Sequence, residues 1–70
     1  MDQTRIGKFI TECRKEVGLT QMQLAERLNI TDRAISKWEC GKAMPDSYLM
    51  LDLCDILGIS VSELLSGKLI

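Results

Sequence analysis

The sequence predicts an all-α fold of five short helices in one domain. Apolar residues recur at intervals of three and four along most of the chain, and no segment alternates apolar and polar residues over a strand's length. A helix-start signal also occurs three times: an apolar residue, then Ser or Thr, then an apolar residue four positions after the Ser or Thr. With 70 residues, the chain is long enough for one modest core.

The first helix is predicted over about residues 4–17. Five apolar residues are spaced so that they share one face of this helix: Ile6, Phe9, Ile10, Cys13 and Val17. Charged residues occupy the opposite face. Gly18 follows, and a glycine commonly ends a helix because it adopts the left-handed conformation without strain.

The three start signals predict helices at about residues 20–28, 31–41 and 60–66. They begin with the pairs Leu19-Thr20, Ile30-Thr31 and Ile59-Ser60. In each, the hydroxyl oxygen can accept a backbone N–H that the first helical turn leaves unpaired, and the flanking apolar residues can contact each other. Gln23 and Glu63 stand where they complete capping boxes. A fourth start, at Pro45-Asp46-Ser47, predicts a helix that Gly58 ends.

The second and third of these five helices form a helix-turn-helix. Only Asn29 and Ile30 separate them, and so short a turn makes the helices cross at a large angle. Asn29 tolerates a left-handed conformation, and Ala25 is small where the two helices approach each other. Four apolar residues supply the shared interior: Leu24, Leu28, Ile35 and Trp38.

The outer face of the helix at 31–41 has side chains that suit the major groove of DNA. It carries polar and cationic residues at helical spacing, together with one cysteine: Asp32, Arg33, Ser36, Lys37 and Cys40. Arg33 can bind guanine through two hydrogen bonds, Lys37 can contact guanine or a phosphate, and Asp32 can accept from cytosine or orient Arg33. Gln21, in the first turn of the preceding helix, can donate to a phosphate.

The charge distribution weighs on both sides of this interpretation. The net charge is −1, whereas DNA-binding domains are often basic. Residues 1–42 carry eight Lys and Arg against six Asp and Glu, and residues 43–70 carry one Lys against four acidic residues. The positive groups therefore lie in the half that contains the motif. The modest total charge predicts modest non-specific affinity for DNA.

The composition excludes several classes of catalytic and metal site. The chain has no histidine, which removes Ser-His and Cys-His nucleophiles, HExxH zinc sites and Cys/His zinc fingers. We therefore expect no enzyme, no catalytic residue, no metal and no cofactor. The three cysteines form no CxxC pair, there is no signal-peptide pattern, and no apolar run approaches the ~20 residues that span a membrane. These features predict a cytoplasmic protein without membrane contact.

The stretch LTQMQLAERLNITDRAISKWECGKAMPD resembles the helix-turn-helix of the phage repressor and Cro family, also called the xenobiotic-response-element family. The preceding IGKFITECRKEVG and the closing LMLDLCDILGISVSELLSG fit the same family, so the resemblance covers nearly the whole chain. It implies a compact, lambda-repressor-like DNA-binding domain of five helices over residues 1–70. Two features depart from the family pattern: Asn29 stands where glycine is frequent, and residues 43–46 lack the cations that some relatives place there.

The resemblance implies a role for each matching residue. Base contacts fall on Asp32, Arg33, Ser36 and Lys37. Contacts with the DNA backbone fall on Gln21, Thr31, Lys42, Ser47 and Tyr48. A buried ion pair that joins the first and third helices falls on Arg14 and Glu39, and Ala25, Ile35 and Trp38 are structural residues of the motif.

The function expected from these observations is sequence-specific regulation of transcription. A repressor is favoured, because occupying an operator is enough to block polymerase. One recognition helix makes few contacts, so we expect a homodimer on a palindromic operator in double-stranded DNA. The apolar tail, Leu64, Leu65, Leu69 and Ile70, is expected to cover a dimer contact or to continue into a C-terminal domain. The alternative is a protein-interaction module, or an antitoxin-type autoregulator with the same fold.

Overall fold

A computed structural model describes all 70 residues and contains five α-helices. They are α1 (Gln3–Glu16), α2 (Gln21–Leu28), α3 (Asp32–Glu39), α4 (Ser47–Leu57) and α5 (Val61–Ser66). The all-α, five-helix prediction is therefore confirmed. The predicted ranges 20–28 and 60–66 were one residue too long, because each included the capping residue. The range 31–41 was three residues too long, and the range 4–17 was displaced by one residue. No helix combines the length and the hydropathy that a membrane-spanning segment needs.

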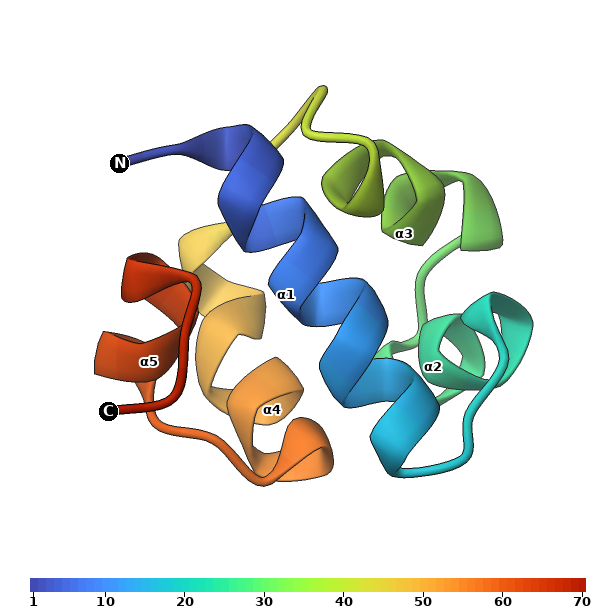
Figure 1. Ribbon diagram of the computed structural model, residues 1–70. Helices are drawn as coiled ribbons and strands as arrows, with labels where there is room; N and C mark the ends of the chain where they lie inside the picture. The colour runs from blue at the N-terminus through green and yellow to red at the C-terminus, as the bar shows by residue number, and fades with distance from the viewer.

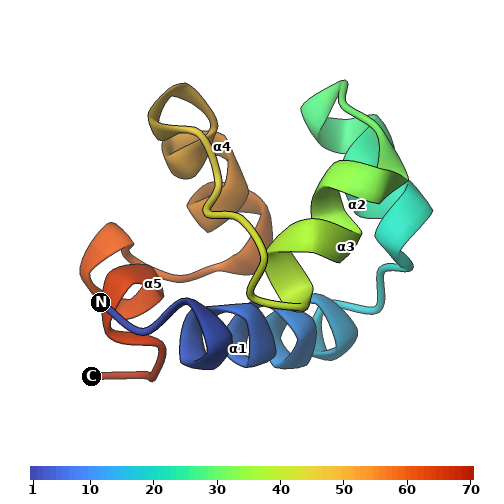
Figure 2. The same ribbon diagram turned by 90° about the horizontal axis from the view of Figure 1, so that it is seen from above.

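α1 runs between the two halves of the molecule (Figure 1). α2 and α3 lie on one side of it, and α4 and α5 lie on the other. Seen from above, α4 and α5 lie to the left and α2 and α3 to the right, while α1 runs along one edge below both pairs (Figure 2). Both chain termini lie at the end of the molecule that α5 occupies. α2 is at the opposite end, whereas the chain that follows α3 contacts the start of α1 near Thr4.

Two helices begin with the predicted capping boxes. At the start of α2, Thr20 Oγ1 accepts the Gln23 N–H at 3.0 Å, and Gln23 Oε1 accepts the Thr20 N–H at 2.9 Å. At the start of α5, Ser60 and Glu63 make the same pair of bonds at 3.0 and 2.8 Å. Each box satisfies two backbone donors that a helix start would otherwise leave unpaired.

The other helix starts differ in how they are capped. Thr31 caps α3 as predicted, and its hydroxyl oxygen accepts the Ala34 N–H at 3.3 Å. α1 has a cap that the sequence analysis did not identify: Asp2 Oδ1 accepts the Arg5 N–H at 3.1 Å. Asp46 occupies the cap position of α4 without a side-chain hydrogen bond. This helix start therefore depends on packing more than on local polar contacts.

One apolar core joins all five helices. Its fully buried members come from each of them: Ile6 and Ile10 of α1, Leu24 of α2, Ile35 of α3, Leu53 of α4 and Leu64 of α5. Trp38 is 4% exposed, as expected for a core residue. The first apolar residues of the three start signals, Leu19, Ile30 and Ile59, are half-buried against this core.

Two residues lie elsewhere than the sequence analysis placed them. Leu64 was assigned to an apolar tail available for a partner, but α5 packs on α1 and buries this side chain completely. It therefore cannot contribute to a dimer contact. Val17 was assigned to the apolar stripe of α1, but it follows the last helical residue, where the chain turns toward α2, and it is exposed.

Candidate nucleic-acid interface

The turn between α2 and α3 depends on one residue with a left-handed backbone. Asn29 has φ 58° and ψ 43°, and it is the only residue other than glycine with a positive φ. The next N–H, from Ile30, returns to the carbonyl oxygen of Ala25 at 3.0 Å. Asparagine thus fills the position where glycine is frequent, because its short polar side chain tolerates this conformation. Ala25 itself is buried, as its small size suggested.

α3 has one buried and one exposed face. Ile35 and Trp38 are buried in the core, whereas Arg33 and Lys37 are exposed. The structure contains a single ion pair, and neither of these two cations belongs to it. The other expected base-contacting residues are also near the surface: Asp32 is exposed and Ser36 is half-buried. α3 therefore presents two unpaired positive charges on the face that the core leaves free.

The residues expected to hold the DNA backbone cluster at helix ends. Gln21 is the first residue of α2, Thr31 caps α3, Lys42 follows α3, and Ser47 and Tyr48 begin α4. All are exposed except Gln21, which is half-buried, and Tyr48 is 76% exposed. Helix N-termini carry partial positive charge and unpaired N–H groups. The N-termini of α2, α3 and α4 each have at least one side chain that can donate to an anion.

Glu39, at the end of α3, is the centre of a polar network that joins three helices. From α1, Arg14 donates to its carboxylate through Nε, 2.7 Å from Oε2, and through Nη2, 3.1 Å from Oε1. Thr11 Oγ1 donates to Oε1 at 2.9 Å, also from α1. Gln21 Nε2 donates to the same oxygen at 3.0 Å from α2. The ion pair that the family resemblance implied is therefore present, with Thr11 and Gln21 as further partners.

The network keeps Glu39 ionised although its side chain is only 5% exposed. Burial raises the pKa of this carboxyl, but hydrogen bonds from Arg14, Gln21 and Thr11 and the Arg14 charge together hold the pKa below its ordinary value. The hydrogen bond to Glu39 in turn raises the pKa of Arg14. Arg14 also donates through Nη1 to the carbonyl oxygen of Leu19 at 2.8 Å. No buried side-chain nitrogen or oxygen is left without a partner.

Gly7 is a second structural residue that the sequence analysis missed. It lies where α1 crosses the end of α3, and a Cβ atom there would be 2.7 Å from the Glu39 carbonyl oxygen and closer still to that of Trp38. Only glycine permits so close an approach of the two backbones. The sequence did indicate this role. A glycine within a helix lowers helix stability by ~1 kcal/mol relative to alanine, so its presence there usually has a packing reason.

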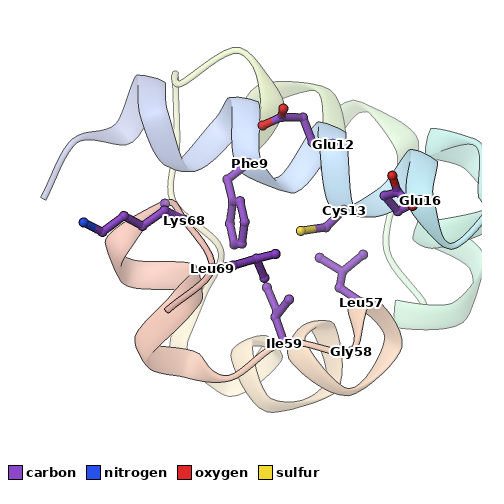
Figure 3. Close-up of a pocket in the computed structure, with 10 residues that line it drawn as sticks. Phe9, Glu12, Cys13, Glu16, Leu57, Gly58, Ile59, Lys68 and Leu69 are labelled. Carbon is purple, nitrogen blue, oxygen red and sulfur yellow. The ribbon is translucent and has the colours of Figure 1, made fainter.

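A groove of about 550 Å³ lies between α1, the α4–α5 connection and the C-terminal tail. The side chains of Phe9, Cys13, Leu57, Ile59 and Leu69 point toward its centre, and Glu12, Glu16 and Lys68 lie around its edge (Figure 3). None of its lining residues belongs to α2 or α3, so the groove is separate from the candidate interface.

The cysteines differ in their surroundings. Burial, followed by nearby carboxylates, raises the pKa of the Cys13 and Cys54 thiols, which keeps both protonated at neutral pH. Cys54 is buried and Cys13 half-buried, so both fill space in or beside the apolar core. Cys40 is exposed at the end of α3.

Comparison with known proteins gives a consistent family. A family model described as helix-turn-helix matches residues 10–64. The chain is 39% identical over 61 residues to the prophage-derived HTH-type transcriptional regulator YonR of Bacillus subtilis, covering 87% of this chain and 56% of YonR. It is also 39% identical over 68 residues to the HTH-type transcriptional activator BcrR of Enterococcus faecalis, covering 97% of this chain and 29% of BcrR. The chain thus spans about half, or less, of these relatives.

A solved structure extends the agreement to three dimensions. The restriction-modification controller protein C.AhdI from Aeromonas hydrophila superposes with a TM-score of 0.80 at 27% sequence identity, covering 90% of this chain and 96% of C.AhdI. The lambda-repressor-like arrangement of five helices is therefore confirmed, as is the resemblance to the phage repressor and Cro type. Because the family model spans most of the chain, including all of α2, α3 and α4, the protein belongs to the helix-turn-helix family.

Proposed function

We propose that this protein is a sequence-specific DNA-binding regulator of transcription whose α3 enters the major groove. The observation that carries this proposal is the two-faced α3, in which Ile35 and Trp38 anchor one side while Arg33 and Lys37 stand exposed and unpaired on the other. An exposed arginine can bind guanine through two hydrogen bonds, and a lysine can reach guanine or a phosphate. Asp32 and Ser36 complete the base-reading set.

The backbone contacts are assigned to the helix ends that surround α3. Gln21, Thr31, Lys42, Ser47 and Tyr48 would donate to phosphates and fix the position of α3 along the duplex. Only Lys42 among them carries a charge. Most of these contacts would therefore set register and orientation, while adding little to the salt dependence of binding.

The printed names of the relatives support a role in gene regulation. YonR is an HTH-type transcriptional regulator, and C.AhdI is a controller protein of almost the same length as the matched region. We infer that residues 1–70 act as one DNA-binding domain. Repression is the proposed outcome, because occupation of an operator is sufficient for it, whereas activation requires an additional contact with the transcription machinery.

A homodimer on a palindromic operator is the proposed binding form. One α3 reads few base pairs, and two copies on half-sites about one helical turn apart multiply the contacts. Leu69 and Ile70 are 68% and 82% exposed, and Leu65 is half-buried, which makes this end of the chain the proposed dimer contact. Truncation after Gly67 should then lower self-association in analytical ultracentrifugation; an unchanged distribution of species would exclude the tail from the contact.

The central experiment is selection from a randomised duplex pool at two salt concentrations. The unmodified protein should enrich a two-fold-symmetric site, and Arg33→Ala/Lys37→Ala should enrich none. Lys8→Ala/Lys15→Ala is the matched control, because it removes the same charge from exposed positions on α1 and should keep the enrichment. Each lost base contact should cost ~1–3 kcal/mol in binding to the enriched site.

Other outcomes of this selection lead to different conclusions. If neither the unmodified protein nor the control enriches a sequence, the fold serves another purpose, and the protein-interaction module becomes the function that fits. The acidic second half of the chain and the apolar groove of Figure 3 favour that second candidate. Equal loss of enrichment in both double variants would show that total charge, and not the face of α3, controls DNA binding.

A further inference from the structure

The side chain of Gln21 has two hydrogen-bonding roles. Under the proposed function it donates to a DNA phosphate from the start of α2. In the structure its Nε2 already donates to Glu39 Oε1 at 3.0 Å. A carboxamide nitrogen carries two hydrogens, so the bond to Glu39 uses one and leaves the other available. The two roles are therefore compatible within one orientation of the side chain.

We propose that Glu39 is a positioning residue for DNA binding, which holds the Gln21 carboxamide so that its second N–H meets a phosphate. This inference rests on the proposed function and identifies how one of its backbone contacts is prepared. A free glutamine side chain loses considerable rotamer freedom when it is ordered. The bond to Glu39 orders it before DNA arrives, so that loss no longer opposes binding.

The position of Glu39 Oε1 is itself fixed from α1. Arg14 donates hydrogen bonds to both carboxylate oxygens of Glu39, at 2.7 and 3.1 Å. The side chains of Arg14 and Glu39 are 10% and 5% exposed. A planar guanidinium fork leaves a carboxylate little freedom to rotate. The last residue of α3 and the first residue of α2 are thus joined through a rigid group. The phosphate contact of Gln21 and the base-reading helix α3 are therefore held in a fixed position relative to each other.

Thr11 provides an internal comparison, because it donates to the same Oε1 at 2.9 Å without leading to the interface. It lies on α1 and is half-buried, and its single hydroxyl hydrogen is shared between Glu39 Oε1 and the Gly7 carbonyl oxygen, which lies 3.1 Å from Oγ1. Replacing Thr11 with valine removes a bond to Glu39 of the same kind as the Gln21 bond. It leaves Gln21 and its bond to Glu39 in place.

The test is a coupling measurement on the duplex enriched in the selection described above. Gln21→Ala should weaken binding by about tenfold, the usual effect of losing a hydrogen bond to a charged group. The salt slope should not change, because glutamine displaces no counterion. In an Arg14→Met/Glu39→Met background, where an apolar pair replaces the buried ion pair, Gln21→Ala should weaken binding by less than about twofold.

Two control variants separate positioning from general loosening of the fold. Thr11→Val should leave DNA affinity unchanged while it lowers thermal stability. Lys42→Ala should weaken binding by the same factor in the unmodified and in the Arg14→Met/Glu39→Met backgrounds, since Lys42 has no hydrogen bond through its side chain to the network. The proposal would be overturned if Gln21→Ala lowered DNA affinity equally in both backgrounds. It would also be overturned if Thr11→Val lowered DNA affinity as much as Gln21→Ala does.

A measurement on the unmodified chain covers the case in which the methionine pair does not fold. The Gln21 side-chain amide should exchange its hydrogens with solvent more slowly than that of Gln3, which is exposed, and the duplex should slow it further. Exchange as fast as that of Gln3 in both states would overturn the proposal. If no duplex is enriched at all, the proposed function fails first, and the Arg33→Ala/Lys37→Ala comparison identifies that failure separately.

Discussion

Gly7 controls how closely α1 can approach the end of α3. We expect Gly7→Ala to lower the free energy of unfolding by ~1–3 kcal/mol, because the added methyl group would overlap the carbonyl oxygens of Trp38 and Glu39. This loss should outweigh the ~1 kcal/mol by which alanine favours a helix interior over glycine. Urea denaturation checks it, with Lys8→Ala, one residue along and exposed, as the control. Equal stability of Gly7→Ala and the parent would show that the helices can move apart at little cost.

Glu39 should make the protein sensitive to acid. Its pKa is lowered in the folded state, so its contribution to stability is fully present above the ordinary carboxyl pKa of about 4.3 and is lost as the pH falls through the folded value. Urea unfolding between pH 6 and pH 2.5 should show a decline below about pH 4. The Arg14→Met/Glu39→Met variant should decline less over the same range. Parallel curves for the two proteins would assign the acid sensitivity to other carboxylates.

Some residue roles could be predicted from the sequence, and others depended on three-dimensional position. Arg33 and Lys37 were found because helical spacing places them opposite Ile35 and Trp38. The bond from Gln21 to Glu39 could not be found in this way. It joins residues 18 positions apart in two helices, and its geometry depends on the angle at which they cross.

Helix starts were predictable because their chemistry is local. Each capping box involves residues three positions apart, so Thr20 with Gln23 and Ser60 with Glu63 could be recognised without knowledge of packing. The burial of α5 was different. Which of its faces meets α1 depends on the path of the α4–α5 connection, and for that reason Leu64 was wrongly assigned to the surface.

The α2–α3 turn provides a test at the scale of a structural element. Asn29→Gly should keep the stability within about 0.5 kcal/mol, because glycine adopts the same φ of 58° without strain while it gains freedom in the unfolded chain. Asn29→Ala should cost ~1 kcal/mol or more, since a left-handed backbone is unfavourable for alanine. Thermal denaturation of both variants gives the comparison. Equal losses would point to the Asn29 side chain, and not its backbone, as the stabilising group.

At the scale of the whole molecule, the first 42 residues carry a net positive charge and the rest a net negative charge. Lys42→Ala should weaken binding to specific and non-specific DNA alike, and reduce the slope of log affinity against log salt by ~0.9. Lys68→Ala makes the same charge change at the groove of Figure 3 and should leave the slope unaltered. Filter binding across a salt series measures both. Equal slope changes for the two variants would mean that the net charge of the whole protein, and not a local phosphate contact, governs DNA affinity.

Fold class and family could be predicted from the sequence because apolar spacing and capping residues, which are local features, mark the helices. The groove could not, because α1, the α4–α5 connection and the tail contribute to it together. Glu63 holds the tail in place by accepting the Ile70 N–H at 3.1 Å. A contact of this kind between an exposed carboxylate and a backbone seven residues away has no sequence signature.

The position of the two termini has a practical consequence for measuring operator affinity. Both lie at the α5 end, beside the proposed dimer contact and away from α2 (Figures 1 and 2). A flexible linker from Ile70 of one copy to Met1 of another would therefore join two DNA-binding domains without crossing the exposed face of α3. Such a tether sets an effective concentration in the millimolar range for the second half-site. Occupancy of the palindrome would then depend on one binding event, and the intrinsic strength of each half-site could be measured apart from self-association.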